Sequence, residues 1–288
     1  MGNLRRFTFG SNAVINFDVT ANWAANGVTD VASFITFMNG QNYQMNLVIS
    51  YFSLIGNRLQ MEYLAGGNTL NLIGSNVIDY QRGVSVLGLE VQNLFLHFNA
   101  LTTFDPIEPC PVNLINLNLS GNQITYINTD KINYLIQTIN VAGSFLTSFT
   151  LNRSLPNLRE ISLGANRLNS LNITAVQPNL YYLDLANGNG FSTFEYGHLF
   201  PKLEVLMFSG QLFSKFAPII PLPNTINTII LNGCRFTTQG YIDSEAWANS
   251  LTVRPGRGQI NLQDNLNSAI GTNFKTILES KGFTVLAN

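Results

Sequence analysis

Three stretches of the chain read LINLNLSGNQI (114–124), IQTINVAGSFL (136–146) and LREISLGANRL (158–168). Their first residues are 22 positions apart both times (136 − 114 and 158 − 136), and apolar residues occupy the same places in each. In the middle of each stretch apolar and polar residues alternate, which is the period of a β-strand with one buried face. The stretches therefore predict three short strands, each with its aliphatic side chains on the same face.

Such a short strand cannot bury its apolar face alone, whereas copies stacked side by side form a continuous core and a parallel sheet. The asparagines at 122 and 166 lie where the chain leaves the strand and turns. Their amides supply donors and an acceptor for backbone groups that the turn leaves unpaired. Because strands stack about 4.8 Å apart and the returning segments are bulkier, we expect the array to curve with its sheet on the concave side.

The pattern resembles the leucine-rich repeat, L-x-x-L-x-L-x-x-N/C-x-L at a period of about 20–29 residues. Further copies begin at residues 91, 180, 203 and 226, and the stretch from Ile260 fits as a last, eighth coil. The resemblance implies an α/β leucine-rich repeat solenoid over 86–267 with a parallel β-sheet on its concave face. The period of 22–23 residues and the ending KGFTV (281–285) resemble repeat proteins of bacteria and bacteriophages.

Residues 1–85 fit the repeat poorly and are expected to form an N-terminal α+β cap or attachment region. Local patterns there predict a strand, a helix and a hairpin, at 14–19, 31–38 and 49–63. An alternative interpretation places part of this region on the repeat template, with Ile49, Phe52, Leu54, Asn57 and Leu59 at its key positions. The α+β interpretation is favoured because a solenoid needs ends that shield its outermost coils.

After Phe236 the spacing of the repeat breaks. The segment 244–251 suggests a helix on the convex side. Residues 268–288 are expected to form a C-terminal cap, with a helix over 268–281 and a strand over 283–286. The turn 254–258 carries two arginines and could bind an anion, although an ordinary turn is the simpler interpretation.

Composition limits the classes of partner. Charged residues make up 11% of the chain and the net charge is −1, which argues against electrostatic capture of nucleic acid or of an anionic membrane. No apolar run is long enough to span a bilayer, and the first residues lack the apolar segment of a signal peptide. These features predict no membrane insertion and a place in the cytoplasm or in a virus particle.

Cys110 and Cys234 are expected to be unpaired, because five strand spacings separate their coils.

No arrangement of residues typical of an enzyme active site stands out, so we expect neither catalysis nor a cofactor nor a metal site. The histidines, His97 and His198, are about a hundred residues apart, which excludes the common local zinc spacings. Glu160 and Asp184 could face the same way on nearby coils as an acid–base pair. A solvated surface is the simpler interpretation of these two carboxylates.

Residues between the inward aliphatic positions are the ones able to contact a partner. Aromatic and Met side chains beside polar ones are typical of contact surfaces, and small residues in a third column would leave the sheet open to close approach. The predicted partner-binding residues are Phe95, His97, Asn118, Asn140, Glu160, Tyr182, Asp184 and Met207. The predicted function is non-enzymatic recognition of a protein or a cell-surface glycan. One alternative is a structural component of a bacteriophage particle, such as a capsid, tail or fibre accessory protein that contacts virion proteins; another is a sheet surface with no binding role.

Overall fold

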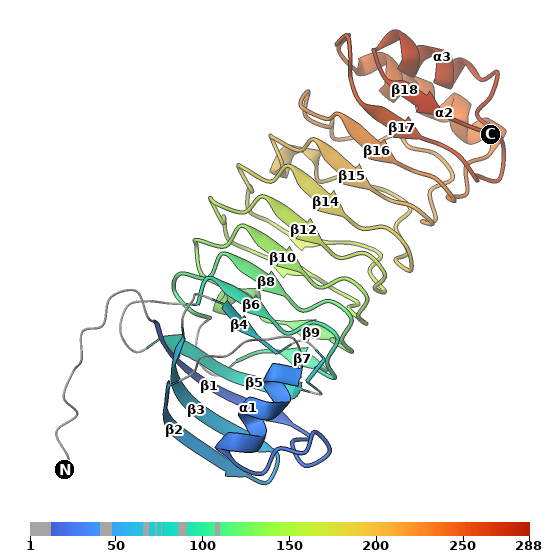
Figure 1. Ribbon diagram of the computed structural model, residues 1–288. Helices are drawn as coiled ribbons and strands as arrows, with labels where there is room; N and C mark the ends of the chain where they lie inside the picture. The colour runs from blue at the N-terminus through green and yellow to red at the C-terminus, as the bar shows by residue number, and fades with distance from the viewer. Residues whose placement is uncertain are drawn as a thin grey trace.

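The computed structural model describes residues 13–40, 48–65, 69–72, 74–75, 77–85, 91–106 and 110–288. A ten-stranded sheet runs from the N-terminal unit to the C-terminal end of the molecule (Figure 1). Its strands lie side by side and each pair is parallel. In spatial order they are β4 (Thr69–Asn71), β6 (Asn93–Phe95), β8 (Asn116–Asn118), β10 (Thr138–Asn140), β12 (Glu160–Ser162), β14 (Tyr182–Asp184), β15 (Val205–Met207), β16 (Thr228–Ile230), β17 (Gln259–Asn261) and β18 (Thr284–Leu286).

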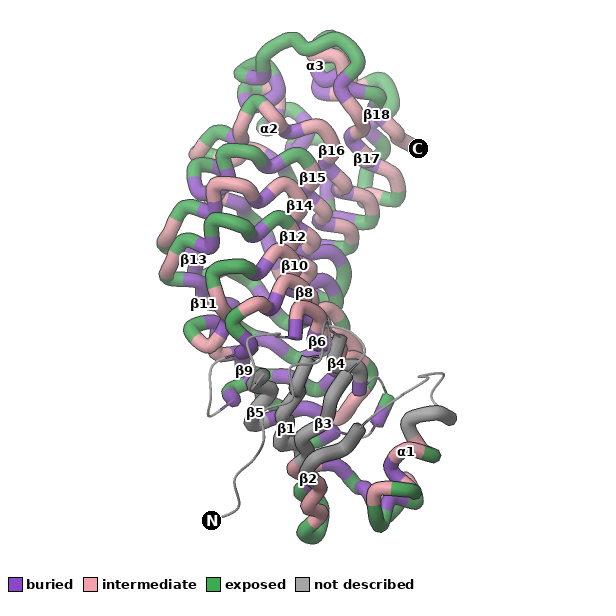
Figure 2. The backbone as a smooth tube through the Cα atoms, turned by 60° about the vertical axis from the view of Figure 1, so that its left-hand side comes forward, coloured by how far each residue is buried: buried purple, intermediate pink, exposed green. Residues whose placement is uncertain are grey.

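The middle residue of each strand from β6 to β17 points into the core. These side chains stand in register across the sheet and are 0% exposed, whereas the residues on either side are half-buried. Figure 2 shows the same alternation repeated from coil to coil. The central residues are Leu94, Leu117, Ile139, Ile161, Leu183, Leu206, Ile229 and Ile260. The predicted strands and their inward faces are therefore confirmed.

The opposite side of each coil is mostly loop. It carries two small parallel sheets, one from β7 (Thr103–Phe104) and β9 (Tyr126–Ile127), the other from β11 (Thr150–Leu151) and β13 (Asn172–Ile173). Short 3-10 turns lie at η1 (Thr129–Lys131) and η2 (Gly197–Leu199). Buried phenylalanines fill the space behind the strands, including Phe104, Phe149, Phe194, Phe208 and Phe213.

A ladder of buried amides connects neighbouring coils. Asn166 is 3% exposed, and its Oδ1 accepts from the backbone N–H of Leu146 at 3.0 Å. Its Nδ2 donates to the carbonyls of Val141 in the preceding coil and Leu163 in its own, both at 2.9 Å. The corresponding amides of Asn99, Asn122 and Asn189 make the same three kinds of bond. The role predicted for this asparagine is thus confirmed.

Three other residue types occupy the same position. Gln211 reaches the same backbone partners as an asparagine, and the Cys234 thiol donates to the carbonyl of Phe208 at 3.2 Å. The hydroxyl of Ser144 is buried and has no hydrogen-bond partner among the described residues. Serine is too short to reach across to the next coil, so this rung of the ladder is the weakest.

The N-terminal unit is an antiparallel sheet with a helix, α1 (Val31–Gly40), beside it (Figure 1). In spatial order its strands are β2 (Val48–Ile55), β3 (Arg58–Ala65), β1 (Ala13–Ala21) and β5 (Val77–Ser85). The predicted hairpin over 49–63 is confirmed by the pairing of β2 with β3 across Gly56-Asn57, and the alternative that placed these residues on the repeat template is wrong.

This unit continues directly into the solenoid. Although β4 lies within 1–85, it joins the long sheet by pairing with β6. The Tyr80 ring stacks on Phe104 at 5.8 Å between centroids, and Val77 exchanges hydrogen bonds with Asn99 and Ala100 of the first well-defined coil. Within the unit, buried Trp23 packs edge-on against Phe34 of α1 at 5.9 Å.

Two helices and the last strand cover the C-terminal end (Figure 1). The helix α2 (Thr238–Ser250) begins before the expected 244, because the Thr237 side chain accepts from the Gly240 N–H and caps it. The helix α3 (Asn273–Ser280) begins after the expected 268, capped in the same way by Thr272. Aromatic contacts extend the core into this cap, from Phe216 to Trp247 at 4.8 Å and from Trp247 to Phe274 at 6.2 Å.

The ladder yields a prediction about stability. Asn166→Ala should lower the free energy of unfolding by about 3–5 kcal/mol, because it leaves one N–H and two carbonyls without their side-chain partner. Ser144→Asn should raise it by about 1 kcal/mol, since the amide can reach the neighbouring coil. Urea unfolding followed by circular dichroism measures both. Asn169→Ala, which removes an exposed amide three residues beyond Asn166, is the control. An equal loss of stability in Asn166→Ala and Asn169→Ala would contradict the ladder's role.

Candidate functional site

The sheet face, which the sequence predicts to be concave, consists of the first and third residues of each strand. Both positions are half-buried in every strand from β6 to β16. The strand register aligns them into two columns. The first column is Asn93, Asn116, Thr138, Glu160, Tyr182, Val205 and Thr228; the second is Phe95, Asn118, Asn140, Ser162, Asp184, Met207 and Ile230.

Seven of the eight predicted partner-binding residues lie on this face, and His97 follows two residues after β6. They do not converge on one point. Glu160, Tyr182, Asp184 and Met207 occupy the adjacent strands β12, β14 and β15 and form one group. Phe95 and His97 lie toward the N-terminal end of the face, and Asn118 and Asn140 lie between the two groups on β8 and β10. Their role in binding stays a prediction.

Part of the polar column is engaged in local structure. The side-chain oxygens of Asn118, Asn140 and Asp184 each accept from the backbone N–H two residues later, at 3.1, 3.0 and 2.8 Å. These are Asx-type turns, which hold the chain as it leaves the strand. One lone pair of each of these oxygens is therefore engaged within the chain and is not available to a partner.

The group around β14 combines polar and apolar contacts. The Tyr182 hydroxyl donates to the Met207 sulfur at 2.9 Å, and the Tyr181 hydroxyl donates to the Glu160 carboxylate. Burial raises the pKa of Asp184, and burial together with the nearby carboxylates raises the pKa of Tyr182. A further methyl group on Gly164 would lie 3.0 Å from the Ala186 carbonyl and 3.1 Å from the Asp184 carboxylate. The absence of a side chain at Gly164 therefore leaves room for the Asp184 carboxylate.

Three aromatic rings meet at the N-terminal end of the face. The His97 ring lies 6.1 Å from Phe95 and 5.2 Å from Phe98 between centroids. Phe98 is 66% exposed and has a φ of 55°, in the left-handed region that a bulky residue rarely adopts. Burial lowers the pKa of His97. Sequence reasoning identified Phe95 and His97 but not Phe98, which stands where the next coil has Gly121.

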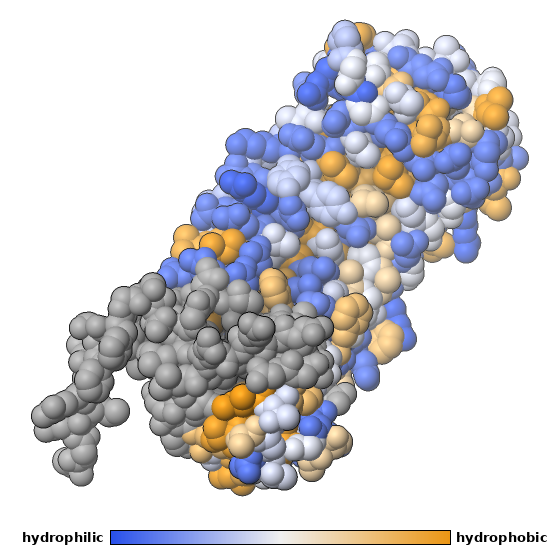
Figure 3. Space-filling view, in the orientation of Figure 1, coloured by the Kyte–Doolittle hydropathy of each residue, from blue (hydrophilic) through white to orange (hydrophobic). Residues whose placement is uncertain are grey.

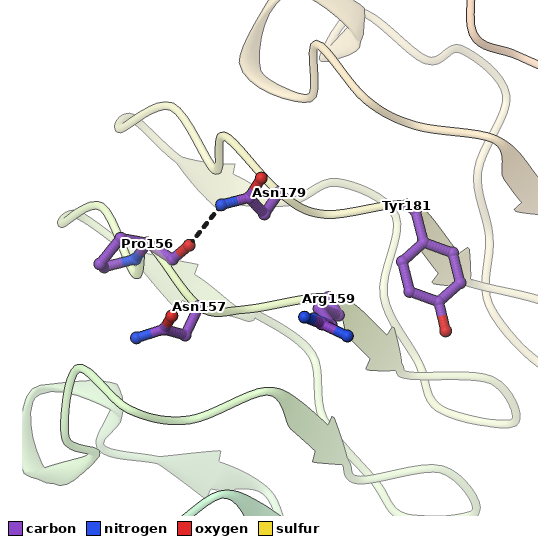
Figure 4. A pocket seen from close by; sticks show the side chains of 5 residues that line it. All are labelled: Pro156, Asn157, Arg159, Asn179 and Tyr181. Carbon is purple, nitrogen blue, oxygen red and sulfur yellow. Dashed lines mark hydrogen bonds between the residues drawn. The ribbon is translucent and has the colours of Figure 1, made fainter.

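Beside the sheet face, at the start of strands β12 and β14, lies a hollow of about 250 Å³ that we call the rim hollow. Its lining comes from two consecutive coils (Figure 4). The lining residues are Pro156, Asn157, Arg159, Asn179 and Tyr181. Sequence reasoning missed it, although the 22-residue spacing of Asn157 from Asn179 and of Arg159 from Tyr181 places these residues at matching positions.

One backbone feature recurs in step with the sheet. Just ahead of each ladder residue from Asn99 to Cys234 is a residue with positive φ, often glycine, as in Gly121, Gly143, Gly210 and Gly233. Strand, left-handed turn and ladder residue thus follow one another at the same places in each coil of 22–23 residues. The fold is a leucine-rich repeat solenoid.

Comparison with known proteins adds little beyond this fold. No protein-family profile matches the sequence, and no curated protein is significantly similar to it. Among solved structures, the chain is similar to YopM from Yersinia enterocolitica WA-314, with 20% sequence identity and a TM-score of 0.38. That match covers 61% of this chain and 42% of the other.

In the part of the chain that the structure describes, no group of three or more His, Cys, Asp and Glu residues is arranged to hold a metal ion. None of its helices is long and apolar enough to cross a membrane. Cys110 and Cys234 are buried and unpaired, as predicted. Burial raises the pKa of their thiols to about 12 and about 11, so both are protonated at neutral pH.

The buried carboxyl of Asp184 leads to a prediction about pH. Its raised pKa means that ionisation costs more in the folded than in the unfolded chain. Stability is therefore lost as the pH rises from the unfolded-state pKa, about 3.9, through the folded pKa. Asp184→Asn keeps the acceptor for the Ala186 N–H, so the variant should be at least as stable as the wild type at pH 7. This advantage should shrink at about pH 3, where the wild-type carboxyl is protonated.

Thermal unfolding at the two pH values measures this difference. Asp184→Ala is the control: it also removes the turn hydrogen bond, so it should be about 1 kcal/mol less stable than Asp184→Asn at both pH values. An Asp184→Asn variant that is less stable than the wild type at pH 7 would show that the carboxylate charge is compensated in the folded chain.

Proposed function

We propose that this chain is a non-enzymatic recognition protein whose sheet face holds a protein partner. The observation that supports this most is a run of large, half-buried side chains across β14, β15 and β16. It consists of Tyr182, Val205, Met207 and Ile230, which neighbour one another through the register of the strands. Figure 3 shows hydrophobic surface over this part of the sheet.

The chemistry of this run suits a protein contact. Tyrosine and methionine are enriched at protein interfaces, and large side chains near the centre of a contact carry most of its energy. Because Tyr182 and Met207 already contact each other through the hydroxyl and the sulfur, their conformations are partly set before binding. A partner then orders fewer side chains, which lowers the entropic cost of association.

The surroundings of the run favour close approach. Gly164 and Ala186, which follow β12 and β14, are small, so neither raises a long side chain of its own above the sheet. Asp184 leaves one carboxylate oxygen for a donor from the partner, since the other accepts from Ala186. With a net charge of −1, long-range attraction contributes little, and shape and burial of apolar surface would govern the affinity.

The test begins with a photo-crosslinking residue in place of Met207, used in an extract of the source organism. A partner captured there, and not from the same residue placed at Tyr126 on the opposite side, is then purified. Tyr182→Ala/Met207→Ala should weaken its affinity by about 30-fold or more, since central contacts contribute about 2 kcal/mol or more. Tyr126→Ala, which removes an exposed tyrosine of β9, should leave the affinity unchanged. Equal affinities of the wild type and the double variant would contradict the proposal.

A second candidate function is display on a bacteriophage particle. What favours it is the antiparallel unit at one end of the solenoid, with β2 at the edge of its sheet and Ile55 at the end of β2 76% exposed. An edge strand can pair with a strand of another protein. Attachment to a particle through this unit would leave the sheet face of the solenoid free to contact other molecules.

Quantitative mass spectrometry of purified particles tests this second candidate. The chain should copurify with the particles in a constant ratio to their major structural protein, through a gradient and a salt wash. A chain found as a cytosolic monomer and absent from purified particles would contradict it. The result leaves the binding role of the sheet face open to its own test.

A further inference from the structure

The rim hollow carries a cation with no partner. Arg159 is exposed, and its guanidinium makes no hydrogen bond or ion pair with any residue that the structure describes. A second cation stands at its edge, because the Lys202 Nζ donates to the Asn179 Oδ1 at 2.7 Å. The carboxylates of Glu160 and Glu204 both lie near Tyr181; Glu160 accepts from the Tyr181 hydroxyl, and neither forms an ion pair with Arg159. The hollow therefore presents a guanidinium whose N–H donors are not taken up by any residue that the structure describes.

An aromatic ring stands opposite this charge in the hollow. Figure 4 shows Tyr181 on one side, Arg159 in the middle, and Asn157, Asn179 and Pro156 on the other side. The bond between the Tyr181 hydroxyl and Glu160 fixes the ring, and it also raises the pKa of Tyr181. The ring is thus a preformed apolar surface beside a planar donor group.

The side-chain amides of Asn157 and Asn179 are held by hydrogen bonds, and one of their oxygens remains available as an acceptor. The Asn157 Nδ2 donates to the Tyr134 carbonyl at 3.0 Å, and the Asn179 Nδ2 donates to the Pro156 carbonyl at 2.7 Å. The Asn179 Oδ1 is taken by Lys202. The Asn157 Oδ1 makes no hydrogen bond with a described residue, so it can accept from a hydroxyl group.

We propose that the rim hollow binds a carboxylated sugar unit. The Arg159 guanidinium pairs with the carboxylate through two parallel hydrogen bonds. The apolar face of the sugar ring packs on Tyr181, and a ring hydroxyl donates to the Asn157 Oδ1. This site is separate from the apolar run of Tyr182, Val205, Met207 and Ile230, and it does not depend on a protein partner there.

The features of the hollow favour a sugar over an acidic side chain of a protein. An aspartate or glutamate would satisfy Arg159 but would leave the Tyr181 ring uncovered and the Asn157 oxygen without a donor. A sugar acid carries all three matching groups on one ring: a carboxylate, hydroxyls and an apolar face. The hollow spans two coils only, which suits a single sugar unit at the end or side of a glycan.

The experiment titrates the full chain with D-glucuronate, D-glucose and acetate, with binding followed by NMR saturation transfer and chemical shifts. D-Glucuronate should bind with a Kd on the order of 1 mM, as small ligands in open sites do. D-Glucose and acetate should each bind at least about 10-fold more weakly, because each lacks one class of contact.

Variants assign the contacts. Arg159→Gln should weaken D-glucuronate binding by about 10-fold or more, since the charged hydrogen bonds are lost. Tyr181→Ala should weaken it, while Tyr181→Phe should keep most of the affinity because the ring remains. Arg235→Gln, which removes an exposed arginine of a later coil, is the control and should bind as the wild type does.

Two results would overturn the proposal. Acetate or a short Glu-containing peptide binding as tightly as D-glucuronate would show a plain carboxylate site without sugar recognition. The absence of saturable binding up to about 20 mM D-glucuronate, well above the expected Kd, would show no such site. Neither result bears on the protein partner, whose test uses Tyr182 and Met207.

Discussion

Side-chain amides that bond to the backbone of two coils at once hold this molecule together. An extended strand of three residues leaves many N–H and C=O groups unpaired as the chain turns into the interior, and unpaired buried groups are costly. An asparagine at the ladder position, such as Asn122 or Asn166, satisfies three of them. The leucines supply most of the burial energy, but these amides determine how one coil sits on the next.

The same geometry determines what remains for function. Because side chains alternate along a strand, burial of the central residue places its two neighbours on the outer surface. The surface is thus a by-product of the core, and its columns run across coils rather than along the chain. The structure also uses some of that surface itself, since Asn118, Asn140 and Asp184 each hold their own turn.

The coils could be predicted from the sequence because their pattern is local and repeats. The spacing of Leu117 from Leu119 and Asn122 is enough to predict the strand, its buried face and the turn that follows it. The N-terminal sheet was less accessible, since β1 lies between β3 and β5 and that order depends on distant pairing. The contact of Tyr181 with Glu160 and the rim hollow join neighbouring coils, and the direction of those side chains is not part of the repeat. Phe98 lies outside the strand positions, although its place just ahead of Asn99, where later coils have Gly121 and Gly143, indicates a left-handed backbone.

The parallel sheet runs without a break from β4 to β18, and each strand within it contacts only the strands before and after it. A whole coil could therefore be duplicated or lost in evolution while both ends stay intact, provided that the removed piece is one full period. Each such event would lengthen or shorten the face by about 4.8 Å. The number of coils therefore sets the length of the sheet face. Gain or loss of coils during evolution can match that length to the size of a binding partner.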